Sequence, residues 1–96
     1  MLKHPLDNEA ARRLIRSILG RGQGGVAFSG HALDEMAKDE LTTVDVANVL
    51  RGGVVEFAEL ISGTWRYRVR TSRMTVVVAF RSETILSVVT AWRKSR

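Results

Sequence analysis

The sequence contains no cysteine, one proline and no long apolar run. Without cysteine the chain can form neither a disulfide nor a thiolate metal site, and the composition fits a reducing compartment. The longest unbroken apolar stretch covers residues 76–80, whereas a membrane-spanning helix needs about 20 residues. Residues 1–5 lack the apolar centre of a secretory signal peptide. We therefore expect a cytoplasmic protein with no membrane partner.

Groups of metal-binding residues are also scarce. The acidic pairs Asp34-Glu35 and Asp39-Glu40 lie in a segment with helical periodicity. Adjacent helix positions diverge by about 100°, so neither pair converges on one ion. A solvated acidic face is the simpler interpretation, and such a face would repel RNA from the helical side. We expect neither a metal ion nor another cofactor.

The positive charge is concentrated in the last third of the chain. The 96 residues carry a net charge of +5. Residues 61–96 contain eight Lys or Arg against one acidic residue, whereas residues 1–60 contain seven against nine. This length predicts one domain. The concentrated positive charge indicates a polyanionic partner, most often nucleic acid, or an acidic protein.

The first half of the chain has the apolar spacing of helices. Asp7, Ser29 and Thr42 are the expected N-caps, and Thr42 forms a capping box with Asp45. These signals predict helices over residues 6–19, 31–41 and 43–51, a glycine-rich loop at 20–25 and a short strand at 26–28.

From Val54 onward the apolar period changes from 3.6 to 2, which predicts strands. The expected strands cover residues 54–61, 64–70, 74–80 and 84–92. The sequence therefore predicts an α+β fold, with helices packed on one face of a twisted antiparallel sheet of about four strands.

An arginine row is the first functional signal. Alternation along a strand puts Arg66, Arg68 and Arg70 on one face, opposite an aromatic and aliphatic face. Neighbours in this row lie about 7 Å apart, close to the step between successive phosphates. Arg73 and Arg81 flank the next strand. A solvated outer face is the alternative, but an arginine row of this kind favours a phosphate-binding surface.

His31 is the second signal, because it lies just inside the expected amino terminus of a helix. The helix dipole there attracts anions, and a neutral imidazole beside a phosphate can accept a proton. A capping or half-buried structural histidine is the alternative. The other histidine, His4, lies in a segment expected to fray.

The last strand adds a hydroxyl and an indole, since Thr90 and Trp92 share one face. Trp92 could stack on a base, which is worth about 1–3 kcal/mol, or could be a core tryptophan with a satisfied N–H. Arg93 extends the basic surface, and Lys94 and Arg96 form a basic tail that could simply be solvated.

Several short motifs resemble a family of small bacterial domains of uncharacterised function, grouped with the RelE/ParE toxin superfamily. A His-Ala pair opens a helix at His31, an acidic-Val pair at Asp45-Val46 lies in the next, and Gly52-Gly53 precedes the sheet. The chain closes on Val88-Val89-Thr90-Ala91. The resemblance covers residues 26–93.

The resemblance implies the barnase–EndoU–colicin–RelE-like ribonuclease fold and metal-independent RNA cleavage by attack of the 2′-hydroxyl. Active members would be toxins held by an antitoxin or immunity protein. By analogy with the tRNA-cleaving colicin D type, His31 would be the acid or base, and Arg66 or Arg68 would stabilise the transition state. Thr90 would hold a phosphate oxygen and Trp92 would pack the substrate. The RNA-binding residues would be Arg70, Arg73, Arg81, Trp92 and Arg93.

The resemblance leaves residues 1–25 and the reaction open. The helix over residues 6–19 and the following loop have no counterpart in the shared motifs; they could cover a sheet edge, form a homodimer or contact an inhibitor. ParE-type relatives inhibit gyrase and cleave no RNA, so the fold is better supported than the reaction. The alternatives are a non-catalytic ParE-like toxin, a small nucleic-acid- or protein-binding accessory protein, or a degenerate member with a structural role.

Overall fold

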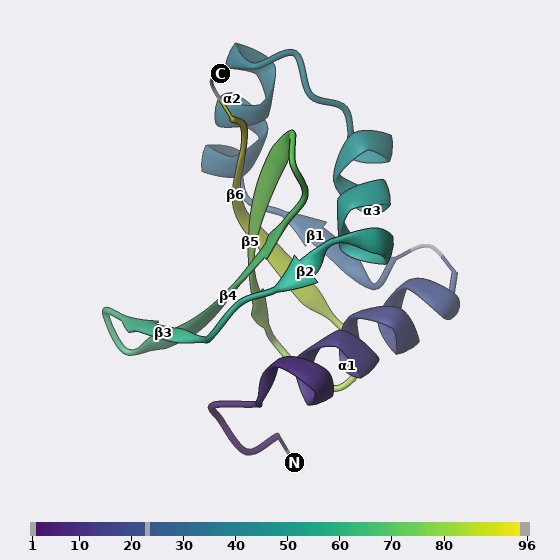
Figure 1. The fold of residues 1–96 in the computed structure, drawn as a ribbon, viewed down its shortest axis with the longest axis vertical. Helices are drawn as coiled ribbons and strands as arrows, with labels where there is room; N and C mark the ends of the chain where they lie inside the picture. Colours follow the sequence, from purple (N-terminus) through teal and green to yellow (C-terminus); the bar gives the residue numbers. More distant parts are fainter. Residues whose placement is uncertain (1, 23, 95–96) are drawn as a thin grey trace.

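The change of periodicity near Val54 separates a mainly helical half of the chain from a half made of strands (Figure 1). The computed structural model describes residues 2–22 and 24–94. Within them the elements are, in chain order, α1 (Asn8–Gly20), β1 (Val26–Phe28), α2 (Gly30–Lys38), α3 (Thr43–Gly52), β2 (Val54–Val55), β3 (Glu59–Ile61), β4 (Thr64–Arg70), β5 (Met74–Phe80) and β6 (Leu86–Arg93).

The α+β class is confirmed, but the sheet has more strands than expected. The described residues form a six-stranded sheet in the order β1-β6-β5-β4-β2, and β3 also pairs with β4. All pairs are antiparallel except β1–β6, which is parallel. The expected strand over residues 54–61 is split into β2 and β3, and only one backbone bond bridges the gap, from Glu56 N to Arg68 O. The expectation of about four strands in an antiparallel sheet was therefore wrong in strand number and in this one pairing.

The predicted helix starts are confirmed by their side-chain caps. Asp7 accepts from Ala10 N, and Ser29 accepts from Ala32 N. Thr42 and Asp45 form the reciprocal capping box, and the bonds from Thr42 lower the pKa of the Asp45 carboxyl. These caps satisfy amide groups that have no partner within the helix, which fixes where each helix begins.

The end of α2 lies earlier than the spacing predicted. The helix stops at Lys38, because Glu40 adopts a left-handed conformation with φ of 56°. The Leu41 amide then donates back to Met36 O at 2.8 Å. This bond satisfies a carbonyl of the last turn and redirects the chain toward α3.

One apolar core joins all three helices to a single face of the sheet. Each helix contributes fully or almost fully buried side chains, such as Ile15, Met36 and Val46. The sheet contributes alternate residues of β4, β5 and β6, among them Tyr67 and Val76. Because all three helices of the described residues share this core, none of them lies on the opposite face of the long strands.

The amino-terminal helix is part of this core. Ala11, Ile15 and Ile18 are fully buried, and α1 packs against α3 and β2 (Figure 1). The apolar side of α1, a helix whose role the sequence left open, is thus used within the chain.

The segment before α1 contacts the sheet through His4 and Leu6. The buried Tyr67 hydroxyl accepts a bond from Leu6 N at 2.8 Å and lies 2.7 Å from His4 Nδ1. Burial raises the pKa of the Tyr67 hydroxyl, and the bond from Leu6 opposes this shift. His4 therefore has a structural contact with the sheet.

Adjacent glycines at the end of α3 provide a test of packing. A Cβ on Gly53 would lie 2.6 Å from Val49 O and 2.8 Å from Val69 Cγ1. We expect Gly53→Ala to lower the free energy of unfolding by about 1–3 kcal/mol, as overpacking does. Gly52→Ala is the matched control, because its Cβ meets nothing within 4 Å; it should be neutral or gain up to about 1 kcal/mol. Equal effects in urea unfolding would contradict the close approach of α3 to β4.

No helix among the described residues has both the length and the apolar character needed to cross a membrane.

Candidate functional site

The sheet face opposite the helices collects most of the predicted site residues. We call it the outer face; it comprises Arg66, Arg68, Arg70, Thr75, Val77, Ala79, Arg81, Ser87, Thr90 and Trp92. Strand register aligns them in rows across β4, β5 and β6: Arg68 pairs with Val77, which pairs with Thr90. The next row joins Arg70, Thr75 and Trp92.

Long side chains cover the middle of the outer face. Thr75 and Ala79 on the central strand β5 are each only 3% exposed, although none of the three helices in the described part of the chain lies over them. Their longer neighbours on β4 and β6 lean across them, as shown by the Arg68 guanidinium, whose carbon lies 5.9 Å from the centroid of the Trp92 ring. The outer face is therefore a layer of arginine and tryptophan over a floor of small side chains.

A β-bulge puts Thr90 and Trp92 on the outer face. Val78 pairs with Val88, but Val77 pairs with Thr90, so Val89 is an extra residue. Val88 and Ala91 both face the core, which regular alternation would not allow. If β6 alternated regularly through Val89, with no bulge, Thr90 and Trp92 would point into the core like Val88. The bulge thus decides whether Trp92 is a core residue or a residue of the outer face. The Trp92 ring lies half-buried on the outer face, beside Arg68.

Two arginines of the row are paired with carboxylates from the segment that contains β2 and β3. Arg68 Nη2 lies 3.4 Å from Glu59 Oε1, and Arg70 Nε lies 2.6 Å from Glu56 Oε2. All four side chains are partly exposed, so each pair contributes little to stability. Their main effect is to reduce the positive charge at this end of the outer face.

At the other end the arginines make no direct ion pair among the described residues, although Glu59 is the strand partner of Arg66. Arg81 Nε donates to Ser87 Oγ at 2.8 Å, and Arg66 Nε is buried without a hydrogen-bond partner. Neither guanidinium lies within 4.0 Å of a carboxylate in the described part of the chain. A hollow of about 270 Å³ lies between them, with Ser29, Thr64 and Ser87 among its lining residues.

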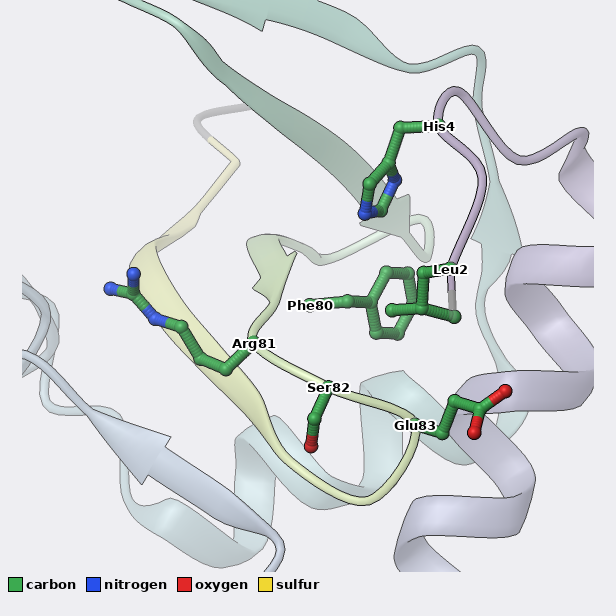
Figure 2. A pocket seen from close by; sticks show the side chains of 6 residues that line it. All are labelled: Leu2, His4, Phe80, Arg81, Ser82 and Glu83. Atoms are coloured by element: carbon green, nitrogen blue, oxygen red, sulfur yellow. The ribbon is translucent and has the colours of Figure 1, made fainter.

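A second hollow lies on the other side of β5, the strand that ends just before Arg81. It measures about 370 Å³ and is lined by Leu2, His4, Phe80, Arg81, Ser82 and Glu83 (Figure 2). In Figure 2 the Arg81 side chain points away from His4 and Phe80. Its bond to Ser87 confirms that the guanidinium belongs to the outer face.

His31 lies in the first turn of α2, as predicted, and is exposed. Its neighbour one helical turn later is Glu35. The hydrogen bond and the charge of Lys38 are the main causes that lower the pKa of the Glu35 carboxyl, and His31 lowers this pKa by a smaller amount. His31 is not among the residues lining the 270 Å³ hollow, although Ser29, two positions earlier, is. The structure therefore brings the start of α2 to the hollow but leaves the imidazole outside its lining.

The two remaining basic residues predicted to contact RNA lie at the other end of the strands. Arg73 is exposed in the β4–β5 turn, where its carbonyl accepts from Lys94 N. The Arg93 guanidinium donates to Asp39 O at 3.0 Å and Glu40 O at 3.4 Å. Arg93 thus links the end of β6 to the backbone just after α2. Arg96 lies outside the described residues.

Four side chains that bear on this site were not predicted to do so. Glu56 and Glu59 neutralise part of the arginine row, and Ser87 and Thr64 line the hollow. Only strand register reveals these neighbours, since they come from different strands. Among the described residues, no group of three or more His, Cys, Asp or Glu is arranged to hold a metal ion.

The carboxylates provide a test of the outer face. We expect the double variant Glu56→Gln/Glu59→Gln to bind single-stranded RNA more tightly at low salt, because it releases Arg68 and Arg70. Two additional phosphate contacts would steepen the slope of log K against log salt by about 1.4. Asp34→Asn/Glu83→Gln makes the same change in net charge away from the outer face and serves as the control. Equal slopes for the two double variants, measured by fluorescence anisotropy, would exclude an effect specific to Arg68 and Arg70.

Comparison with known proteins gives one match. Residues 28–93 match the family described as Domain of unknown function (DUF4258). No curated protein and no solved structure matches the chain significantly. The matched range covers α2, α3 and β2 to β6, and therefore most of the outer face. Since it spans more than half of the 96 residues, the chain belongs to the DUF4258 family.

Proposed function

We propose that this domain is a metal-independent endoribonuclease that binds RNA on its outer face and acts as the toxin of a toxin–antitoxin or toxin–immunity pair. The observation that carries the proposal is the convergence of Arg66, Arg68, Arg70 and Arg81 with Trp92 on a sheet face that no helix covers. Arginine forks bind phosphate oxygens, and an indole can stack on a base. The resemblance to the RelE/ParE superfamily adds the reaction type.

The reaction needs no group beyond those of the chain and the RNA. The 2′-oxygen attacks the adjacent phosphorus and loses its proton, while the bond from phosphorus to the 5′-oxygen breaks and that oxygen gains a proton. The products are a 2′,3′-cyclic phosphate and a 5′-hydroxyl. In this proposal His31 transfers one of the protons, Arg66 or Arg68 stabilises the charged transition state, and Thr90 holds a phosphate oxygen.

A non-catalytic RNA-binding role is the second candidate. It is favoured by the position of His31, which does not line the 270 Å³ hollow between Arg66 and Arg81. In that role the outer face would bind RNA through phosphate contacts and stacking, and its affinity would fall with salt without any cleavage.

Labelled RNA in the presence of EDTA separates the two candidates. We expect the protein to cut tRNA or mRNA fragments with EDTA present and to leave termini with a 2′,3′-cyclic phosphate. The matched substrate control is the same sequence with 2′-deoxy nucleotides, which lacks the attacking hydroxyl and should stay intact. Binding without products would support the non-catalytic role. The absence of both cleavage and salt-dependent binding would overturn both candidates.

A further inference from the structure

We propose that the hollow between Arg66 and Arg81 binds a single phosphate group, and that this is the point at which the outer face holds its ligand's phosphate. That the phosphate comes from RNA rests on the function proposed above. The site itself rests on the charges, hydrogen bonds and shape of the hollow.

The first argument is the distribution of charge among four arginines. Arg68 and Arg70 have carboxylates at 3.4 Å and 2.6 Å. Arg66 and Arg81 have none within 4.0 Å in residues 2–22 and 24–94. Glu59 is the strand partner of Arg66 but makes its ion pair with Arg68, so the two of these four guanidinium groups that make no direct ion pair with a described residue are those that line the hollow. The electrostatic attraction for an anion is therefore stronger at the hollow than beside Arg68 and Arg70, whose charges are paired with carboxylates.

The second argument is the state of Arg66. Its Nε is buried and has no hydrogen-bond partner in the structure. A buried donor without an acceptor costs free energy, which is recovered when the guanidinium meets an oxygen. Because Arg66 lines the hollow, a phosphate there would offer its guanidinium acceptor oxygens.

The third argument is the fixed orientation of Arg81. Its Nε donates to Ser87 Oγ at 2.8 Å, which leaves both terminal nitrogens available for a bidentate contact with an oxyanion. The Ser87 hydroxyl accepts this bond and keeps its own hydrogen for donation. Figure 2 shows the Arg81 side chain extending away from the pocket around His4 and Phe80.

The shape of the hollow matches a small ligand. Its volume of about 270 Å³ lies just below the usual range for small-molecule pockets, about 300–1,000 Å³. It accommodates a phosphate with part of one nucleotide, whereas a duplex would need a wider surface. Ser29, the N-cap of α2, lines the hollow, so the positive end of the helix dipole also faces this region.

Titration with inorganic phosphate tests the site without RNA. In ¹⁵N-resolved NMR spectra, we expect shifts in the Nε signals of Arg66 and Arg81 and in the amide signals of Ser29 and Ser87. Arg81→Gln and Arg66→Gln should each weaken phosphate binding at least ten-fold. The charge-matched control is Arg51→Gln, on the exposed side of α3, which should change the affinity less than two-fold.

Several outcomes overturn the inference. It fails if Arg68→Gln weakens phosphate binding as much as Arg66→Gln, or if the shifts spread evenly over all exposed arginines. If Arg66→Gln does not fold, judged by its amide spectrum, Arg81→Gln alone decides, because its side chain is at the surface.

An RNA arm separates this inference from the proposed function. Phosphate binding that depends on Arg66 and Arg81, without any RNA binding or cleavage, would leave the site standing and would overturn RNA as its source. The opposite result is RNA cleavage that inorganic phosphate does not inhibit, with phosphate binding that is unchanged in Arg66→Gln and Arg81→Gln. That result would support the nuclease function and would overturn the phosphate site.

Discussion

Replacement of His31 by alanine is expected to slow RNA cleavage by about 10²- to 10⁴-fold, the usual contribution of a positioned general acid or base. The fold should survive, because the side chain is exposed and alanine is a better helix former. The rate is measured as single-turnover cleavage of a labelled RNA with EDTA present. RNA affinity should change little, since the binding groups belong to the outer face.

The control for this variant is Lys38→Ala, which removes an exposed side chain from the same helix. It should cleave RNA at close to the wild-type rate, and both variants should have similar thermal midpoints. Full activity of His31→Ala would remove the imidazole from the mechanism and would shift attention to groups that line the hollow. That result would mean that another proton carrier lies closer to the scissile phosphate.

Replacement of Ile15 by alanine is expected to lower the free energy of unfolding by about 2–5 kcal/mol. Ile15 is fully buried in α1, the helix that packs against α3 and β2. A loss of this size is a large part of the 5–15 kcal/mol that is typical of a small domain. Urea unfolding followed by circular dichroism gives the value, with the slope of the transition as a check on two-state behaviour.

Leu33→Ala is the matched control, since Leu33 also lies in a helix but is 48% exposed. It should cost about 0.5 kcal/mol or less. An Ile15→Ala cost no greater than that of Leu33→Ala would show that α1 packs only loosely. The comparison bears on domain boundaries: the family match begins at residue 28, whereas the core extends back into α1. We therefore expect residues 26–96 alone to be less stable than the whole chain.

Local signals explain which parts of the fold could be predicted. A cap such as Ser29 acts on amides three residues away, so its effect can be identified from the sequence. The alternation of β4 is equally local. The parallel pairing of β1 with β6 was not predicted, because it joins residues about 60 positions apart and β1 has only three residues. The gap between β2 and β3 was missed for a similar reason, since apolar residues continue through it.

The candidate site shows the same division between local and distant information. The row of Arg66, Arg68 and Arg70 follows from strand geometry and was predicted. Their partners were not, because the pairing of Arg70 with Glu56 depends on how a distant segment aligns with β4. The position of His31 in a helix turn was predicted, but its placement outside the hollow depends on how α2 docks on β6.

Because Val89 is an extra residue in β6, the strand register after the bulge decides which residues at the end of β6 face the core and which face solvent. If β6 kept all its residues but lost the bulge, Val89 would pair with Val77, and the Trp92 indole would turn inward while Ala91 turned out. The indole is far larger than the space that Ala91 vacates, so the core would be overfilled while the arginines lost their aromatic neighbour. Deleting Val89 itself would make the pairs Val78–Val88 and Val77–Thr90 consecutive, so it would remove the bulge and leave the Trp92 indole on the outer face.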